Sequence, residues 1–235
     1  MNTRGLNIPF VRFGPTVTSD NLFDDKEQAI FDFYEQNKDR YKKALDIGAN
    51  IGVHSILMMR QGWSVRSYEP DPIHFERLWE NVELNCRWKD LLPDCRENAV
   101  SDHNGRETFV RVKGNTTGSH LKGDKQPYGE LEEFQVDVVD CRPLFAHGDF
   151  AKIDCEGHEA RLLKTVTPDC RCEFMVEVGN VDNALEIWTH FWRTDYKLYS
   201  QKRGWSPCRY LPDMPKHHSE GSLFIGRTPP FPTST

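Results

Sequence analysis

An acid-rich block in the second half of the chain carries the residues best suited to proton transfer. Asp154, Glu156 and His158 follow a short apolar run at alternate positions. A second apolar run ends at Glu177. Side chains at the carboxyl ends of parallel strands meet at one crevice of an open α/β sheet. Because carboxylates and imidazoles there can remove a proton from a reacting hydroxyl, we take Asp154, Glu156 and His158 as candidate catalytic residues.

The same residues also have structural interpretations. Glu156 could cap the helix that is predicted to follow it, and His158 could be a solvated helix residue. Lys152 lies two positions before Asp154, on the same face of the strand, and could pair with its carboxylate. The sequence therefore leaves the identity of a base open.

A glycine loop nearer the N-terminus indicates a nucleotide-binding unit. Residues 43–55 read as a short apolar strand, a turn at Gly48 and the start of a helix. Gly48 lets the backbone turn sharply, and Gly52 lets strand and helix pack closely. A second strand, about twenty residues downstream, ends in Glu69, whose carboxylate can accept hydrogen bonds from both hydroxyls of an adenosine ribose.

The glycine count distinguishes two cofactor classes. A dinucleotide loop has the pattern G-x-G-x-x-G, because a pyrophosphate sits on the helix N-terminus. Here the second and third glycine positions are Asn50 and Val53. S-adenosylmethionine has no phosphate and carries a sulfonium cation and an amino-acid tail, which Asp46 and Asn50 suit better. A third strand end would bring Asn98 to the same crevice, where it could contact adenine.

Composition limits the other classes of function. The chain has 235 residues, 37% of them hydrophobic and 28% charged, which suits one globular domain. The net charge of −6 argues against a large nonspecific nucleic-acid surface. We find no apolar run of membrane-spanning length and no signal-peptide core. The odd number of cysteines, seven, and the one-residue separation of Cys170 and Cys172 favour reduced thiols in a cytoplasmic protein.

The patterning predicts an arm and a helix over residues 1–40, a catalytic domain over 41–228 and a flexible tail over 229–235. The predicted helix after the arm extends from Asp24 or Asp25 to about Arg40. A further helix begins at Pro72, with a predicted buried face of Phe75, Leu78, Trp79, Val82 and Leu84. The Gly- and Thr-rich stretch from Lys113 to Glu130 is predicted to form a lid over the substrate.

With these residues in place, the chain resembles the FkbM family of S-adenosylmethionine-dependent methyltransferases. The matching segments are Asp46 to Gly52, Tyr68 to Pro72 with Leu78 and Asn81, Asn98 to Asp102, and Ala151 to Glu159. They occur in the family's order, and the lysine, aspartate, glutamate and glycine block is the most specific of them. The resemblance covers residues 42–180, and nothing in the first or last forty residues matches.

The resemblance implies an α/β, Rossmann-like class I methyltransferase fold with a seven-stranded, mostly parallel sheet and helices on both faces. It implies a cofactor site for S-adenosyl-L-methionine built from Asp46, Gly48, Ala49, Asn50, Gly52, Glu69, Pro70, Asn98, Ala99 and Asp154. Characterised members mostly methylate hydroxyls of sugars or natural products. We therefore expect an O-methyltransferase with a small-molecule or glycan acceptor.

A metal-dependent mechanism is the first alternative. Asp154 and Glu177 could offer oxygen ligands to magnesium or calcium, and His217 and His218 could approach from the closing strands. Hard cations need several oxygen ligands, and the sequence nominates only two, so we favour a base without a metal.

Two further alternatives concern the class of protein. Glu69-Pro70 with Asn81 and Asn85 also resembles tRNA-guanine methyltransferases, but the acidic balance argues against an RNA acceptor. The second of these alternatives is a non-catalytic cofactor-binding module with the same fold, since fold does not fix function. The intact Asp46, Glu69 and Asp154 argue against it. The sequence does not indicate an oligomeric state.

Overall fold

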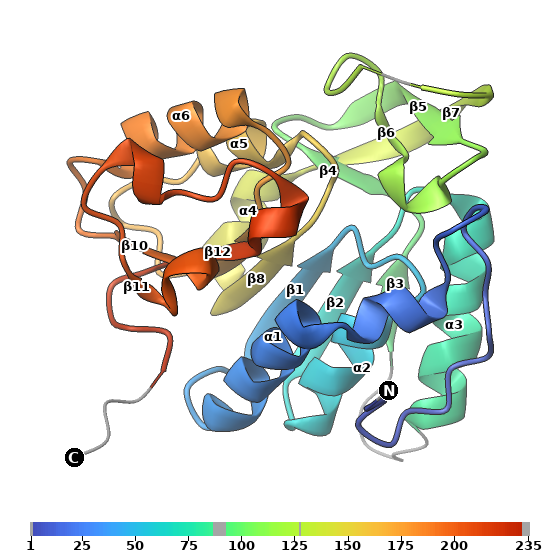
Figure 1. Cartoon of the computed structure of the whole chain (residues 1–235), viewed down its shortest axis with the longest axis horizontal. Coiled ribbons are helices and arrows are strands. Elements are labelled where there is room, and N and C mark those ends of the chain that lie inside the picture. The colour runs from blue at the N-terminus through green and yellow to red at the C-terminus, as the bar shows by residue number, and fades with distance from the viewer. Residues whose placement is uncertain (1, 87–92, 127, 232–235) are drawn as a thin grey trace.

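The computed structural model describes residues 2–86, 93–126 and 128–231, and its centre is an eight-stranded sheet (Figure 1). The strand order is β11-β10-β12-β9-β8-β1-β2-β3. From β9 to β3 the strands are parallel, whereas β12 is antiparallel to both β9 and β10. The bounds are β1 Lys43–Ile47, β2 Ser64–Tyr68, β3 Asp94–Arg96, β8 Phe150–Ile153, β9 Glu173–Glu177, β10 Lys197–Ser200, β11 Ser206–Pro207 and β12 Ser222–Gly226.

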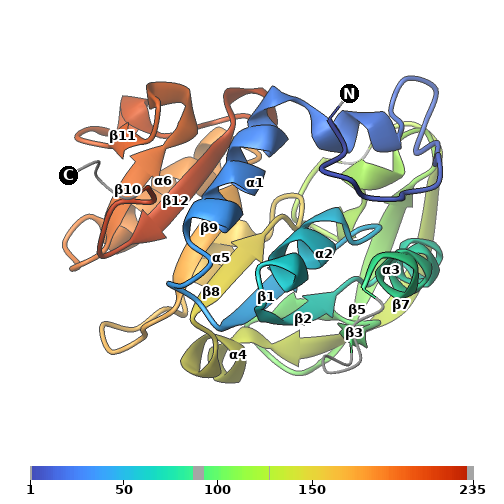
Figure 2. The ribbon, with the colours of Figure 1, turned by 90° about the horizontal axis from the view of Figure 1, so that it is seen from below.

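Helices cover both faces of this sheet, as Figure 2 shows. One layer contains α1 (Asp25–Gln36), α2 (Val53–Arg60) and α3 (Pro72–Asn85). The other contains α4 (Cys141–His147), α5 (Glu159–Leu163) and α6 (Val181–Phe191). Alternate strand residues supply the two cores, because successive side chains of a strand point to opposite faces. Ala44, Phe150, Met175 and Phe224 face the first layer, and Leu45, Ala151, Phe174 and Ile225 face the second.

The predicted Rossmann-like fold class is confirmed, but the count of seven strands is wrong. The two-residue strand β11 extends one edge of the sheet. The predicted third strand end, which carries Asn98, is divided: β3 ends at Arg96, and β4 (Ala99–Ser101) joins a separate sheet. That sheet has the order β4-β7-β5-β6, with β5 Gly105–Val112, β6 His120–Leu121 and β7 Leu131–Asp140. The long antiparallel pair of β5 and β7 forms its centre.

The N-terminal segment is packed more closely than a surface arm. Leu6 and Phe13 are 6% and 2% exposed and belong to the core under α1 and α2. A short 3-10 helix, η1 (Ser19–Phe23), leads into α1, which ends at Gln36 instead of Arg40. The division at residue 40 therefore stays a prediction, since residues on both sides of it share one core.

The described part of the predicted C-terminal tail is also anchored. Asn37 donates from Nδ2 to the carbonyl oxygen of Pro230 at 2.8 Å, and Arg40 donates to that of Pro229 at 2.8 Å. Phe231 packs against the core of the first layer. Residues 232–235 lie outside the described residues.

The predicted buried face of α3 is partly wrong. Trp79 and Leu84 are 41% and 38% exposed, whereas the polar residues His74 and Asn81 are buried beside Leu78 and Val82. Asn81 donates from Nδ2 to the carbonyl oxygen of Ile51 at 2.8 Å, which ties α3 to the glycine loop. Buried polar groups that bond to backbone are invisible to an apolar pattern.

The remaining elements are short 3-10 helices: η2 Thr116–Gly118, η3 Gln201–Arg203, η4 Leu211–Asp213 and η5 His218–Glu220. No helix in the described part of the chain has the length and apolar character needed to cross a bilayer. All seven cysteines lie in described segments and are free.

Candidate active site

A cavity of about 220 Å³ opens at the carboxyl ends of β1, β2 and β8. The chain order reverses between β1 and β8, and the crevice at such a switch point is where open α/β sheets bind ligands. Of the predicted site residues, the cavity is lined by Gly48, Ala49, Asn50, Glu69, Pro70, Asn98, Ala99, Asp154, Glu156 and His158. Tertiary structure thus brings together the predicted cofactor and catalytic residues, with Asp46 and Gly52 as exceptions.

The glycine loop is shaped by close backbone approaches. Gly48 has φ +78°, and a Cβ there would lie 1.8 Å from the carbonyl oxygen of Asp154, so only glycine fits. Gly52 has φ +88°, and its added Cβ would lie 2.6 Å from Cδ1 of Leu78. Gly52 therefore serves the contact of the loop with α3, beyond the strand–helix packing that we expected, and does not line the cavity.

The amide groups of this loop are bonded within the protein. The N–H groups of Gly48 and Ala49 donate to the carbonyl oxygen of Tyr68 at 3.0 and 2.9 Å. The N–H of Asn50 donates to Oε2 of Glu69 at 2.8 Å. A pyrophosphate needs free amides at this place. The loop therefore fits a cofactor without a phosphate, as the glycine count indicated.

Glu69 joins the end of β2 to this loop from a buried position. It is 5% exposed, and its Oε1 accepts a hydrogen bond from the N–H of Asp71 at 2.9 Å. Burial raises the pKa of Glu69 to about 8, although the N–H groups of Asp71 and Asn50 favour the carboxylate. An adenosine ribose at this wall of the cavity could form hydrogen bonds with the Glu69 carboxyl, which can gain or lose a proton near its pKa of about 8.

Asp46 lies beneath the loop and is 0% exposed. Its Oδ2 accepts a hydrogen bond from Oγ of Ser55 at 2.5 Å, and Oγ of Ser67 lies 2.7 Å from that of Ser55. This chain of contacts fixes the start of α2 against β1 and β2. The structure thus gives Asp46 a positioning role, and direct contact with the cofactor stays a prediction.

In the acid-rich block, Asp154 pairs with Lys152. Nζ of Lys152 lies 2.9 Å from Oδ2 of Asp154, which confirms the pairing that the spacing suggested. Burial opposes a charge on Lys152, but the carboxylates of Asp154, Asp46 and Glu27 together raise its pKa. Lys152 is therefore held as a cation at the floor of the cavity.

Glu156 does not cap the following helix. It has φ +53°, and its Oε2 accepts a charge-assisted hydrogen bond from Nζ of Lys125 at 2.5 Å. Burial and the neighbouring Asp154 raise the pKa of Glu156, whereas Lys125 opposes the shift. Helix α5 has no side-chain cap, and Glu159 instead accepts hydrogen bonds from the N–H groups of Gly157 and Cys155 in the preceding turn, at 2.9 and 3.2 Å.

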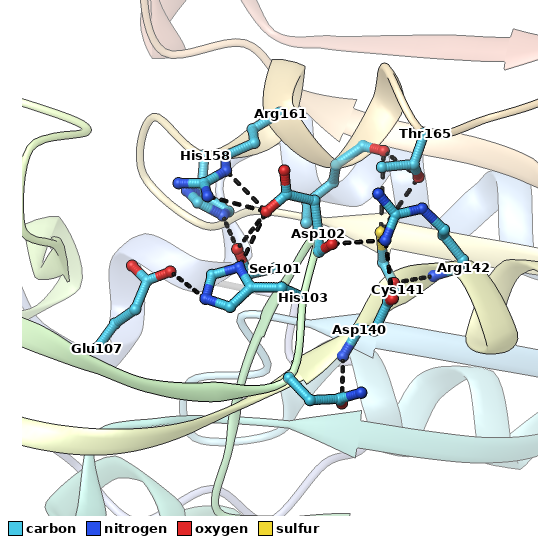
Figure 3. Close-up of polar contacts among 12 residues, drawn as sticks. Ser101, Asp102, His103, Glu107, Asp140, Cys141, Arg142, His158, Arg161 and Thr165 are labelled. Carbon is cyan, nitrogen blue, oxygen red and sulfur yellow. Dashed lines mark hydrogen bonds and ion pairs between the residues drawn. The ribbon is translucent and has the colours of Figure 1, made fainter.

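His158 is 1% exposed, so the interpretation as a solvated helix residue is wrong. Its Nε2 lies 2.9 Å from Oγ of Ser101, and its Nδ1 lies 2.8 Å from Oδ2 of Asp124. Figure 3 shows the network behind Ser101. Asp102 pairs there with Arg161 at 2.9 Å, and the guanidinium lowers the pKa of this carboxyl. The network fixes the end of β4 against α5, and with it the position of the His158 ring.

Comparison with known proteins assigns the family. Residues 46–198, more than half of the chain, match the model of the methyltransferase FkbM domain. The chain belongs to the FkbM methyltransferase family. It is thus an S-adenosylmethionine-dependent methyltransferase. The comparison with curated proteins finds no matching sequence.

Solved structures with a similar fold are distant in sequence. The hMettl16 catalytic domain in complex with the MAT2A 3′UTR hairpin 6 has 12% identity and a TM-score of 0.48, covering 98% of this chain and 78% of that one. The human methyltransferase 10 domain containing protein has 15% identity and a TM-score of 0.44, covering 94% and 85%. The Pyrococcus abyssi tRNA (uracil-54, C5)-methyltransferase in complex with S-adenosyl-L-homocysteine has 13% identity and a TM-score of 0.42. The match covers 85% of this chain and 37% of that one.

Two residues that the sequence analysis did not nominate line the cavity from the N-terminal side. Glu27 of α1 and His54 of α2 line the cavity, with Nε2 of His54 lying 3.0 Å from Oε2 of Glu27. The hydroxyl of Tyr34 lies 2.9 Å from Nδ1 of the same ring. Glu27 falls on the apolar stripe of α1, seven positions before Tyr34. An acid in an otherwise apolar helix face was the signal available for it.

Glu177 also lines the cavity, at the end of β9. Burial, followed by the charges of Asp154, Glu156 and Glu27, raises its pKa well above the usual value. Four carboxyl groups therefore share this side of the methyltransferase cavity with Lys152. In two of them, Glu156 and Glu177, burial and the neighbouring carboxylates raise the pKa.

The segment predicted to be a lid is docked onto the acid-rich block. Thr116 reaches His74 of α3, with Oγ1 and Nε2 separated by 3.0 Å. At the other end, Asp124 and Lys125 contact His158 and Glu156, and a Cβ on Gly157 would lie 2.8 Å from the carbonyl oxygen of Asp124. The segment thus lines the cavity and holds two of the candidate catalytic side chains. Its closing over the acceptor stays a prediction.

We expect that replacing Lys125 by methionine frees this segment, because the ion pair with Glu156 is lost in a half-buried place. Chymotrypsin should cleave after Tyr128, which is 48% exposed, several-fold faster than in the unchanged protein. S-adenosylhomocysteine should slow the cleavage of both the unchanged protein and the Lys125→Met variant. The control is Lys122→Met, which removes a surface pair with Glu133. Equal cleavage rates in the two variants would contradict the docking role of Lys125.

The buried carboxyl of Glu159 should make folding stability fall as pH rises. Burial raises its pKa to about 8, although the N–H of Gly157 opposes this. Between the unfolded pKa and about 8, the folded state therefore holds a proton that the unfolded state has released. Stability should decrease by on the order of 1 kcal/mol per pH unit in this window. In the Glu159→Gln variant, the free energy of unfolding measured with urea should depend less on pH. An unchanged slope would contradict the assignment of this pH dependence to Glu159.

Proposed function

We propose that this methyltransferase transfers the methyl group of S-adenosylmethionine to a hydroxyl oxygen of a sugar-like or natural-product acceptor. The observation that carries the proposal is the group of carboxyls at the cavity, Glu27, Asp154, Glu156 and Glu177. Carboxylates accept hydrogen bonds from hydroxyls, and a hydroxyl acceptor must lose its proton as the bond to carbon forms.

The proposed cofactor site uses the glycine loop for the amino-acid tail, Glu69 for the ribose and Asn98 with Ala99 for adenine. S-adenosylmethionine supplies an electrophilic methyl group on a sulfonium. The chain then has to align the acceptor oxygen behind that carbon and exclude water, and alignment alone supplies much of the rate enhancement.

In the proposed reaction the acceptor oxygen forms a bond to the methyl carbon while the carbon–sulfur bond breaks. The products are the methyl ether, S-adenosylhomocysteine and a proton, which a cavity carboxylate accepts. Asp154 and Glu156 are the proposed bases, and Glu177 is a further one because it faces the same space. Both ring nitrogens of His158 have protein partners, which supports a positioning role for this residue.

The metal-dependent alternative would use Asp154 and Glu177 as ligands. In the described segments no three His, Cys, Asp or Glu side chains converge with the geometry of a metal site. His217 and His218 stack on each other in the region of η5, with ring centroids 3.8 Å apart, and neither lines the cavity.

A methyl-transfer assay with labelled cofactor tests the proposal. The acceptors are a panel of glycans and small alcohols, with total RNA and a protein fraction assayed in parallel, each with and without chelator. Label on a hydroxyl of the panel is the expected result. Label on RNA or protein only would overturn the hydroxyl acceptor, and activity that chelator abolishes would favour the metal-dependent mechanism over the free base.

A further inference from the structure

Helix α6 carries a second apolar face that the fold leaves uncovered. Its inner face, with Ala184, Ile187 and Phe191, is buried against the sheet and α5. On the outside, Val181, Leu185 and Trp192 are 55%, 47% and 57% exposed, and Trp188 is half-buried between them. We call Val181, Leu185, Trp188 and Trp192 the outer stripe. A soluble surface helix normally presents polar residues here.

The spacing of the outer stripe is the same from either end. Its residues are separated by four, three and four positions, which places them on one side of a helix. An antiparallel second α6 would therefore set Val181 opposite the partner's Trp192, and Leu185 opposite the partner's Trp188. Each indole would face an aliphatic side chain, the large-against-small arrangement by which helix ridges interdigitate. Within one chain, the ring centroids of Trp188 and Trp192 lie 5.2 Å apart.

The charges of α6 favour the same partner and the same direction. Asp182 lies in the first turn of the helix, and Arg193 lies just after its last residue. Antiparallel pairing brings Asp182 of each copy near Arg193 of the other and sets the two helix dipoles in opposite directions. Within the described segments neither Asp182 nor Arg193 has an ion-pair partner of its own. A parallel arrangement would place like charges together.

We propose that the outer stripe is a two-fold interface through which two copies of this chain pair along α6, with Asp182 facing the partner's Arg193. One helix buries less than the about 800 Å² per partner of a standard interface. The dimer is accordingly weak and forms in the micromolar range of concentration, with no effect on the fold of the single chain.

Sedimentation velocity of the full chain over about 1 to 200 µM tests the interface. The expected result is a concentration-dependent shift from monomer to dimer. Trp192→Glu should abolish the shift, whereas Ile73→Glu, at an apolar position 55% exposed on α3, should retain it. A monomer throughout the range, or a dimer that Trp192→Glu leaves intact, would overturn the proposal. Binding of the monomer to phosphatidylserine vesicles through the same tryptophans would replace it by a membrane contact.

A charge exchange tests the two-fold direction. Asp182→Arg and Arg193→Asp should each weaken dimerisation about tenfold, and the double variant should recover to within about threefold of the original dissociation constant. Asp182→Arg also places a cation in the first turn of α6, which destabilises the helix. The double variant keeps that cost, so recovery of the dimer separates pairing from helix stability. Failure of the double variant to recover, with the fold intact by circular dichroism, would overturn the antiparallel register.

Discussion

Replacing Asp154 by asparagine should reduce kcat for methyl transfer to a hydroxyl acceptor by about 100-fold or more. Asparagine keeps the size of the side chain but cannot take up the proton of the acceptor. It also leaves the buried Lys152 cation without the carboxylate that lies 2.9 Å away. The expected result follows from a carboxylate held at the carboxyl end of β8, in the wall of the cavity.

The measurement is a single-turnover assay with labelled cofactor, together with calorimetry of S-adenosylhomocysteine binding. Cofactor affinity should change much less than the rate, because the lost interaction concerns the acceptor proton. Asp137→Asn is the matched control, since this residue pairs with Arg106 on an exposed part of β7. A rate within a few-fold of the unchanged protein would show that the proton leaves through Glu156, Glu177 or solvent.

In the unchanged protein the rate should also fall at low pH as the accepting carboxylate becomes protonated. Burial raises the pKa of Glu156, with Asp154 adding to the shift and Lys125 and Lys152 opposing it. The loss should therefore begin at a higher pH than an exposed glutamate would give. Lys125→Met should move the profile to still higher pH, because a neighbouring cation is removed. A profile that Lys125→Met leaves in place would indicate that Glu156 does not carry the proton.

Replacing Glu69 by alanine should weaken binding of S-adenosylmethionine by more than tenfold, or roughly 1.5–3 kcal/mol. The variant loses the proposed acceptor of both ribose hydroxyls. It also leaves the N–H groups of Asn50 and Asp71 without the partner that holds them at 2.8 and 2.9 Å. Isothermal titration calorimetry measures the change, with Glu76→Ala on the exposed side of α3 as control. An unchanged dissociation constant would show that the ribose does not bind at Glu69.

Cofactor affinity should also depend on pH through the same residue. The pKa of Glu69 is raised to about 8 by burial, so the free protein holds this proton at neutral pH. Ribose hydroxyls donate to the carboxylate and favour its ionised form, so binding releases a proton. Affinity should therefore rise with pH up to the free-state pKa and level off above it. Glu69→Gln should give a flat dependence, and a parallel rise in that variant would assign the proton to another group.

The sequence by itself determined the parts of the site that lie within one strand–loop–helix segment. Gly48 and Gly52 predict a turn at the end of a strand because glycine readily adopts positive φ angles, here +78° and +88°. The positions of Glu69 and Asp154 follow from strand ends, since parallel strands bring these ends to one edge. The order of these segments along the chain was sufficient for the family and the cofactor class.

Tertiary structure decided which polar groups face one another. His158 meets Ser101 and Asp124 across separations of 57 and 34 residues, and Glu27 enters the cavity from a helix that showed no match to the family. Tertiary structure also places Ala99 to Ser101 in the second sheet, whereas the sequence pattern assigned these residues to the first. Local propensity carries no information on such pairings, because they form only when distant elements pack and bury polar side chains that must then find partners.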